Sequence, residues 1–217
     1  MPDDLLIRRV AVAAAGIVYW GGVLIQARRV RRHIGRSPNL KPRSTKERVL
    51  WAGWMIVVLT WILQPFLLRI QPAFQGQADT LQLWPFHFGL WIPDFGLHRG
   101  CMVAGIGLLV AGYLGTLWCY AAMGDAWRIG VNRAEKNALI TSGPYGRIRH
   151  PIYSFQVVML LGAALLLPTA ISLGILLFHL ICVWMKASDE EAYLHTVHGP
   201  AYEGYAARTG RLIPRIV

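Results

Sequence analysis

Two short segments in the second half of the chain carry the residues whose types and spacing could do chemistry. The first is Arg149-His150-Pro151-Ile152-Tyr153, preceded by the turn-forming Gly143-Pro144-Tyr145. Proline is well suited to the first position of a helix, so a helix is predicted to begin at Pro151. The free N–H groups of its first turn, with Arg147 and Arg149 near by, would attract an anion. A carboxylate or phosphate of a cofactor would fit there.

The second segment contains two adjacent carboxylates, Glu190 and Glu191. Successive positions of a helix differ by about 100°, so the two side chains cannot point the same way. One can face a pocket beside the helix that begins at Pro151, while the other meets water or a basic residue. The pocket carboxylate could hold an ammonium group or a ribose hydroxyl. For such a pair taken alone, a solvated helix face is the simpler explanation, and this alternative stays open.

The residues after this pair predict a break and a short C-terminal helix. His198-Gly199-Pro200 interrupts the preceding helix, and Tyr202 and Tyr205 follow. Residues three apart share a helix face, so the two tyrosines lie together. The helix either rests on a membrane surface or covers a site formed by the two segments above.

Other kinds of site find no support in the sequence. The three cysteines, Cys101, Cys119 and Cys182, show neither disulfide nor metal-ligand spacing. No Cys/His cluster indicates a metal site. No glycine-rich nucleotide fingerprint is present, so a Rossmann domain is not indicated. No residue is assigned as a catalytic acid, base or nucleophile.

The elements that must position these residues are membrane spans. Of 217 residues, 55% are hydrophobic and 15% are charged, and the charges lie between long apolar blocks. Each block approaches the ~20 residues that a helix needs to cross a bilayer, the fourth being short. The five blocks are Val10–Ala27, Val49–Leu68, Cys101–Met123, Ile152–Leu167 and Thr169–Met185. The first has no cleavage site after it and is expected to be a retained span rather than a signal peptide.

The basic residues are distributed unevenly over the loops between these blocks. They gather between blocks one and two, between blocks three and four, and after block five. The positive-inside rule then predicts an outer N-terminus and a cytoplasmic C-terminus. The net charge of +11 does not indicate nucleic acid, because no aromatic residues are interleaved with the basic run of the first loop. That loop either sets the topology or docks an anionic lipid.

Two connections between blocks are informative. Pro168-Thr169 leaves room only for a tight hairpin, so blocks four and five are antiparallel neighbours. The hairpin brings residues 124–151 and 186–217 together on the inner side. The outer loop, 71–100, contains prolines and, between residues 84 and 95, five aromatic residues, and is expected to form an interfacial segment or a cap. These aromatic residues are Trp84, Phe86, Phe88, Trp91 and Phe95.

The two motifs and their spacing resemble the isoprenylcysteine carboxyl methyltransferase and phospholipid methyltransferase superfamily. The resemblance rests on Arg149-His150-Pro151-Ile152-Tyr153, a hydrophobic hairpin, and Glu190-Glu191 before a short helix. It covers roughly residues 101–217. It implies an all-α, polytopic membrane enzyme that uses S-adenosylmethionine. By carry-over, the residues that would line the cofactor pocket are His150, Pro151, Tyr153, Glu190 and Glu191, with Tyr145, Arg149 and Tyr205 as further contributors.

The resemblance also shapes the expected organisation and function. The chain is expected to form a single membrane domain, residues 1–217, in which 101–217 are the cofactor-binding core. Residues 1–100 would supply two spans, the basic loop and the aromatic outer loop. The acceptor would be a lipid-like or small apolar molecule offering a carboxylate, thiol or amine. The enzyme would be a multi-pass protein of the inner or plasma membrane in a bacterium, with its site facing the cytoplasm.

Two other functions remain open at this stage. Membrane sterol and steroid reductases have similar local sequence around a His-Pro motif but bind NADPH. The glutamate pair favours the methyltransferase, because carboxylates attract an ammonium group rather than phosphates. A small transporter or assembly protein would carry ionisable residues within its spans. Apart from His179, the apolar blocks contain almost none.

Overall fold

The computed structural model describes residues 2–35, 45–71, 80–83, 89–90, 99–127 and 138–215. The five expected apolar blocks are five helices, each longer than or close to its block. Their bounds are α1 (Pro2–Ile34), α2 (Thr45–Leu67), α3 (Arg99–Met123), α4 (Pro151–Leu166) and α5 (Ala170–His198). A short sixth helix, α6 (Pro200–Arg208), follows directly on α5. The expected all-α class is confirmed.

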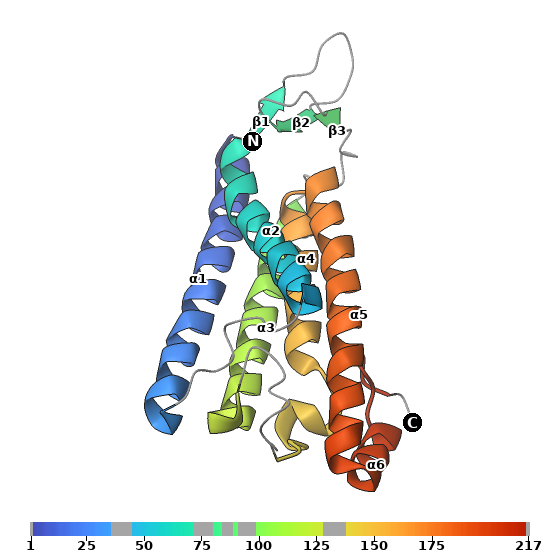
Figure 1. Cartoon of the computed structure of the whole chain (residues 1–217). Coiled ribbons are helices and arrows are strands. Elements are labelled where there is room, and N and C mark those ends of the chain that lie inside the picture. The colour runs from blue at the N-terminus through green and yellow to red at the C-terminus, as the bar shows by residue number, and fades with distance from the viewer. Residues whose placement is uncertain are drawn as a thin grey trace.

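The helices form a bundle whose two ends differ (Figure 1). One end holds the N-terminus, and the other holds α6 and the C-terminus. Between α2 and α3 lies a small antiparallel sheet of β1 (Leu68–Gln71), β2 (Thr80–Leu83) and β3 (Gly89–Leu90), in the order β1-β2-β3. It is an addition to the expected helical fold. The five aromatic residues predicted to cap this end, and residues 36–44 of the basic first loop, lie outside the described residues.

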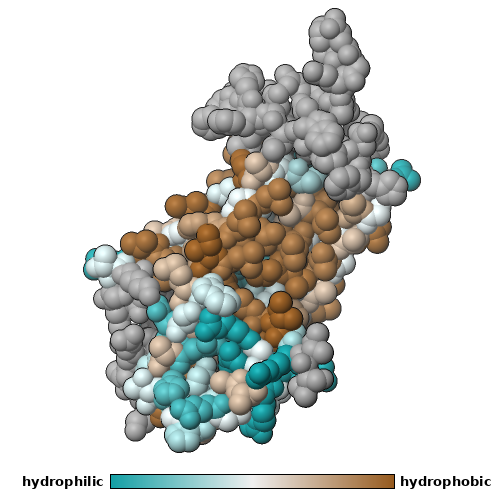
Figure 2. Space-filling view, turned by 90° about the vertical axis from the view of Figure 1, so that its right-hand side faces the viewer, coloured by the Kyte–Doolittle hydropathy of each residue, from teal (hydrophilic) through white to brown (hydrophobic). Residues whose placement is uncertain are grey.

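The surface of the bundle is that of a multi-pass membrane protein. Helices α1, α2, α3 and α5 are long and apolar enough to cross a bilayer, whereas α4 has only 16 residues. Large apolar side chains such as Ile25, Phe66, Val103 and Leu177 are exposed on the four long helices. Figure 2 shows an apolar band over the middle of one side and hydrophilic residues at the α6 end. Lipid chains would cover this band.

Helix α4 is the central element of the bundle. It packs closely on α3, where glycines bring the two backbones together. A Cβ atom on Gly112 would lie 2.7 Å from the carbonyl oxygen of Phe155, and one on Gly162 2.7 Å from that of Gly105. Small residues at such contacts are typical of helix packing in membranes, where apolar side chains gain little by leaving lipid. This packing fixes the face of α4 that carries His150, Tyr153 and Gln156.

The hairpin between α4 and α5 is confirmed, and its tip is held by polar side chains from other helices. Arg8 of α1 is only 1% exposed and donates to the carbonyl oxygens of Leu165 and Leu166, at 3.4 and 3.2 Å. Gln64 of α2 donates to Thr169 at 2.5 Å and to Ser172 at 2.8 Å. The last carbonyls of a helix have no partner within it, so Arg8 supplies what the end of α4 lacks.

Replacing Arg8 with methionine is expected to destabilise the fold without affecting the other end of the bundle. Buried carbonyls left without a donor cost about 1–3 kcal/mol, which for a chain of this size lowers Tm by roughly 4–8 °C at the middle of that range. Thermal unfolding in detergent measures this. The control is Arg99→Met, because Arg99 is 81% exposed in its 3.5 Å pair with Asp4. An equal loss in both variants would contradict the capping role.

Candidate functional site

The segment before α4 is fixed by the C-terminal end of the chain. A short 3-10 helix, η3 (Gly143–Gly146), buries Pro144 and Tyr145. The backbone N–H groups of Arg149 and His150 donate to the carbonyls of Gly210 and Arg211, at 2.8 and 3.1 Å. These bonds join two segments that are 61 residues apart in the sequence. The start of α4 is therefore held in place by the segment that follows α6.

Tyr205 of α6 adds a side-chain bond to the same arrangement. Its hydroxyl donates to the carbonyl oxygen of Tyr145 at 2.7 Å. Burial raises the pKa of Tyr205 to about 12, so the phenol keeps its proton and acts as the donor. Tyr145 in turn donates to the sulfur of Met123 at 2.9 Å. Helix α6 thus lies against the site, as expected if the helix covers the site rather than resting on the membrane surface.

The two adjacent glutamates point to different partners. Glu190 lines a pocket, where its Oε1 accepts a 2.7 Å hydrogen bond from the hydroxyl of Tyr153. Glu191 lies behind the pocket, where its carboxylate accepts from Arg149 Nε at 2.8 Å and from Arg211 Nε at 3.0 Å. The 100° step along the helix separates the carboxylates as expected. One meets the pocket and the other meets basic residues.

His150 lies between these two carboxylates. Its Nδ1 is 3.3 Å from Glu190 Oε2, and its Nε2 is 3.3 Å from Glu191 Oε1. The ring is 7% exposed and is stacked on Tyr153, with 5.7 Å between the ring centroids. Burial by itself would lower the pKa of His150, but the two carboxylates outweigh it and raise the pKa above its ordinary value. In its protonated form, the ring of His150 links the carboxylate of Glu190 in the pocket to that of Glu191 behind it.

The raised pKa of His150 predicts a pH dependence of stability. A group whose pKa is higher in the folded state contributes stability that is complete below its unfolded pKa of 6.5. That stability is lost as pH rises through the folded-state pKa. We therefore expect the Tm of the wild-type protein to fall over this window, measured from about pH 6 to pH 9. The variant His150→Gln should lack this decline.

The control for this pH series is His195→Gln. His195 is 59% exposed and contacts Glu203 at 2.8 Å, away from the pocket. This variant should keep the decline of the wild-type protein. A decline that persists in His150→Gln would assign the effect to another group.

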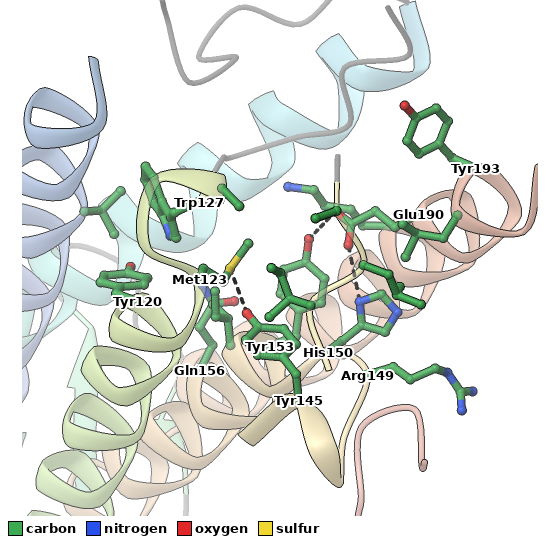
Figure 3. A pocket seen from close by; sticks show the side chains of 18 of the residues that line it. Tyr120, Met123, Trp127, Tyr145, Arg149, His150, Tyr153, Gln156, Glu190 and Tyr193 are labelled. Carbon is green, nitrogen blue, oxygen red and sulfur yellow. Dashed lines mark hydrogen bonds and ion pairs between the residues drawn. The ribbon is translucent and has the colours of Figure 1, made fainter. Parts of the chain in front are cut away.

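The pocket itself is lined by residues from all six α-helices, and mostly by aromatic and apolar side chains. Figure 3 shows Glu190, His150 and Tyr153 on the α5 side and Gln156 and Tyr120 on the α3 side. Of the residues expected to line it, those that do are Tyr145, Arg149, His150, Tyr153, Glu190 and Tyr205. Pro151 is buried as the first residue of α4, and Glu191 is behind the wall.

Arg149 does not offer its guanidinium as an anion site. Besides Glu191, it donates to the carbonyl oxygens of Ala206 and Thr209, at 3.1 and 2.5 Å. In Figure 3 the guanidinium points away from Glu190. Its contacts connect α5, α6 and the start of α4, so Arg149 fixes the positions of the residues that face the pocket.

Several lining residues were missed by reasoning from the sequence. Those within helices are Tyr19, Trp54, Tyr120, Gln156 and Lys186, whereas Met123 ends α3 and Trp127 follows a 3-10 helix, Gly124–Ala126. A signal was available for one of them, because Gln156 is a polar residue within the fourth apolar block. Polar groups inside spans are expensive and often functional. Among the described residues, no group of histidine, cysteine and acidic side chains could hold a metal ion.

The second half of the chain is similar to known proteins. Residues 101–201 match the family model of phospholipid methyltransferases. The chain is 35% identical over 88 residues to the protein-S-isoprenylcysteine O-methyltransferase of Schizosaccharomyces pombe, a match covering 39% of this chain and 36% of that protein. No solved structure gives a significant match.

Two bacterial proteins are also similar. The nickel-cobalt-cadmium resistance protein NccN of Alcaligenes xylosoxydans xylosoxydans is 27% identical over 110 residues, which cover 50% of this chain and 51% of that protein. The cobalt-zinc-cadmium resistance protein CzcN of Cupriavidus metallidurans is 27% identical over 129 residues, which cover 59% and 53%. The chain thus spans about half the length of these two relatives.

Proposed function

We propose that the chain is a membrane methyltransferase that uses S-adenosylmethionine, because residues 101–201 match the family model of phospholipid methyltransferases and the chain is similar to a protein-S-isoprenylcysteine O-methyltransferase. The observation that carries this proposal is the partly buried Glu190, which faces a pocket rich in aromatic rings. S-adenosylmethionine carries a sulfonium, an ammonium and a carboxylate, and is a net cation. A carboxylate and aromatic faces both attract cations.

The residues of the pocket suit this cofactor in kind. Glu190 would hold the ammonium group or a ribose hydroxyl, and the hydroxyl of Tyr153 with the ring of His150 keeps the carboxylate in place. The start of α4 offers N–H groups to the carboxylate of the cofactor. When bound, the cofactor supplies an electrophilic methyl group. The aromatic walls exclude water from the acceptor, which favours direct displacement.

The remaining work of the chain is to hold two molecules in line. Arg149, Glu191 and Arg211 fix α6 and the start of α4 relative to α5, so that the walls of the pocket keep their places. A bound cofactor would supply the methyl carbon and keep the electrons of its carbon–sulfur bond, the acceptor would supply a lone pair, and any acceptor proton would pass to water. No covalent bond to the protein is needed.

The distribution of charge supports a cytoplasmic site. The basic residues Arg31 and Arg32 end α1, and Arg208 ends α6, at the same end of the bundle as the pocket (Figure 1). Under the positive-inside rule this end faces the cytoplasm. The exposed apolar band begins beside it, so an acceptor that is lipid-like or small and apolar could enter from the bilayer.

The experiment that tests the function is calorimetry on the protein in detergent. We expect S-adenosylmethionine and S-adenosylhomocysteine to bind with a Kd on the order of micromolar, and His150→Ala to abolish both. NADPH should not bind, because its phosphates would meet Glu190. Binding of NADPH in place of the other two would establish the reductase, and binding of none would favour a transport or assembly role.

A further inference from the structure

The pocket has a charged end and an uncharged end. Its ionisable lining residues among the described part of the chain, besides the tyrosines, are Arg149, His150, Lys186 and Glu190, all from the start of α4 and from α5. The opposite end is formed by α1, α3 and the middle of α4 (Figure 3). Its side chains include Tyr19, Tyr120, Met123, Trp127 and Gln156, none of which carries a charge at neutral pH. The cofactor proposed above belongs at the charged end.

Gln156 provides an amide group at the uncharged end of the pocket. Its side chain is 5% exposed, and its Nε2 donates to the hydroxyl of Tyr19 at 2.5 Å. The other amide atom, Oε1, is buried and has no hydrogen-bond partner among the residues that the structure describes. Buried polar atoms are satisfied in the large majority of cases, and an exception calls for an explanation. A ligand that brings a hydrogen-bond donor to this end of the pocket would satisfy the atom.

The chemistry of that atom selects among possible ligands. A carbonyl oxygen accepts from N–H and O–H groups but repels a carboxylate, which has no proton to donate at neutral pH. Among the described lining residues, no cation lies at this end to offset the repulsion, since Arg149, His150 and Lys186 lie at the other end. The surrounding rings and Met123 would instead pack against an apolar body.

We propose that Gln156 determines the specificity for the methyl acceptor, and that it selects an apolar molecule with a neutral, donor-bearing head group over a carboxylate. This inference rests on the methyltransferase function proposed above and names the class of its acceptor. An uncharged amine is one such head group. Its nitrogen lone pair forms the bond to the methyl carbon, the carbon–sulfur bond breaks towards sulfur, and one N–H proton passes to water. An amide cannot take up that proton, so Gln156 orients the acceptor and is not a base.

The test compares two probes that differ only in the head group, 4-decylaniline and 4-decylbenzoate. Each is titrated by calorimetry into the full chain in detergent, with and without S-adenosylhomocysteine. The wild-type protein should bind the aniline at least about tenfold more tightly than the benzoate. Gln156→Leu should abolish this preference and keep its affinity for S-adenosylhomocysteine. Gln156→Met serves as a second variant of similar volume if the leucine variant does not fold.

The matched control is Gln64→Leu, which removes a buried amide at the far end of the bundle. It should keep the preference for the aniline. A wild-type preference for the benzoate, equal affinities, no binding of either probe, or an unchanged preference in Gln156→Leu would each overturn the proposal. The titration with S-adenosylhomocysteine alone is separate, so failure of the cofactor and failure of the acceptor site are distinguishable.

Discussion

The variant Glu190→Gln is expected to bind S-adenosylmethionine about 10–100-fold more weakly than the wild-type protein, because a hydrogen bond to a charged group contributes about 1.5–3 kcal/mol. Glutamine keeps the size of the side chain and can still accept from Tyr153. It lacks the negative charge that would attract the cation and that balances His150. Calorimetry at a fixed pH measures the loss of affinity directly.

The control for this variant is Glu203→Gln. Glu203 is a 59% exposed glutamate of α6 that pairs with His195, away from the pocket. It should leave the affinity unchanged. If Glu190→Gln binds the cofactor as the wild-type protein does, the carboxylate in the pocket does not hold it. Glu190 would then be an ordinary polar residue of the pocket wall.

The variant Glu191→Ala is expected to act first on stability. Its carboxylate bonds to Arg149 and Arg211, and its removal leaves two partly buried guanidinium groups without their shared partner. Breaking a buried ion pair from one side costs about 3–5 kcal/mol. Because the Arg211 side chain is 26% exposed, we expect the lower end, about 3 kcal/mol, or a Tm loss of roughly 6–12 °C.

A double variant separates this charge imbalance from a loss of packing. Adding Arg211→Met to Glu191→Ala removes one of the unpaired charges and should recover part of the lost Tm. Thermal unfolding of the wild-type protein, both single variants and the double variant gives the coupling between the two residues. Additive losses would show that the two groups do not interact in the folded protein.

Three features could be predicted, because each depends on local rules. They are the spans, the hairpin, and the different directions of the two glutamate side chains. Hydropathy gives the spans, a two-residue connection gives the hairpin, and the helical step separates Glu190 from Glu191. That Glu190 rather than Glu191 faces the pocket was not predictable. It follows from how α5 is rotated against α4, which the spacing of residues along α5 does not reveal.

The contribution of the first two helices to the site could not be predicted either. Tyr19 and Trp54 lie in apolar stretches where an aromatic residue has no distinguishing context. Their place in the pocket depends on contacts with residues such as Gln156, 137 positions away from Tyr19. The partner of Glu191, Arg211, was likewise hidden, because the bridge that places it joins residues 148 and 210. The spacing of residues along one helix does not predict contacts between residues so far apart in the sequence.

The short length of α4 has a consequence for how the chain enters the membrane during synthesis. Its 16 residues span about 24 Å, less than the ~30 Å of the hydrocarbon region. Alone it would leave the carbonyls at its end in lipid, since Arg8 reaches them only after α1 has packed beside it. Helix α4 should therefore insert together with α5, as a hairpin whose tip is completed by a helix made much earlier. The order in which the helices assemble would then depend on one residue near the N-terminus, Arg8.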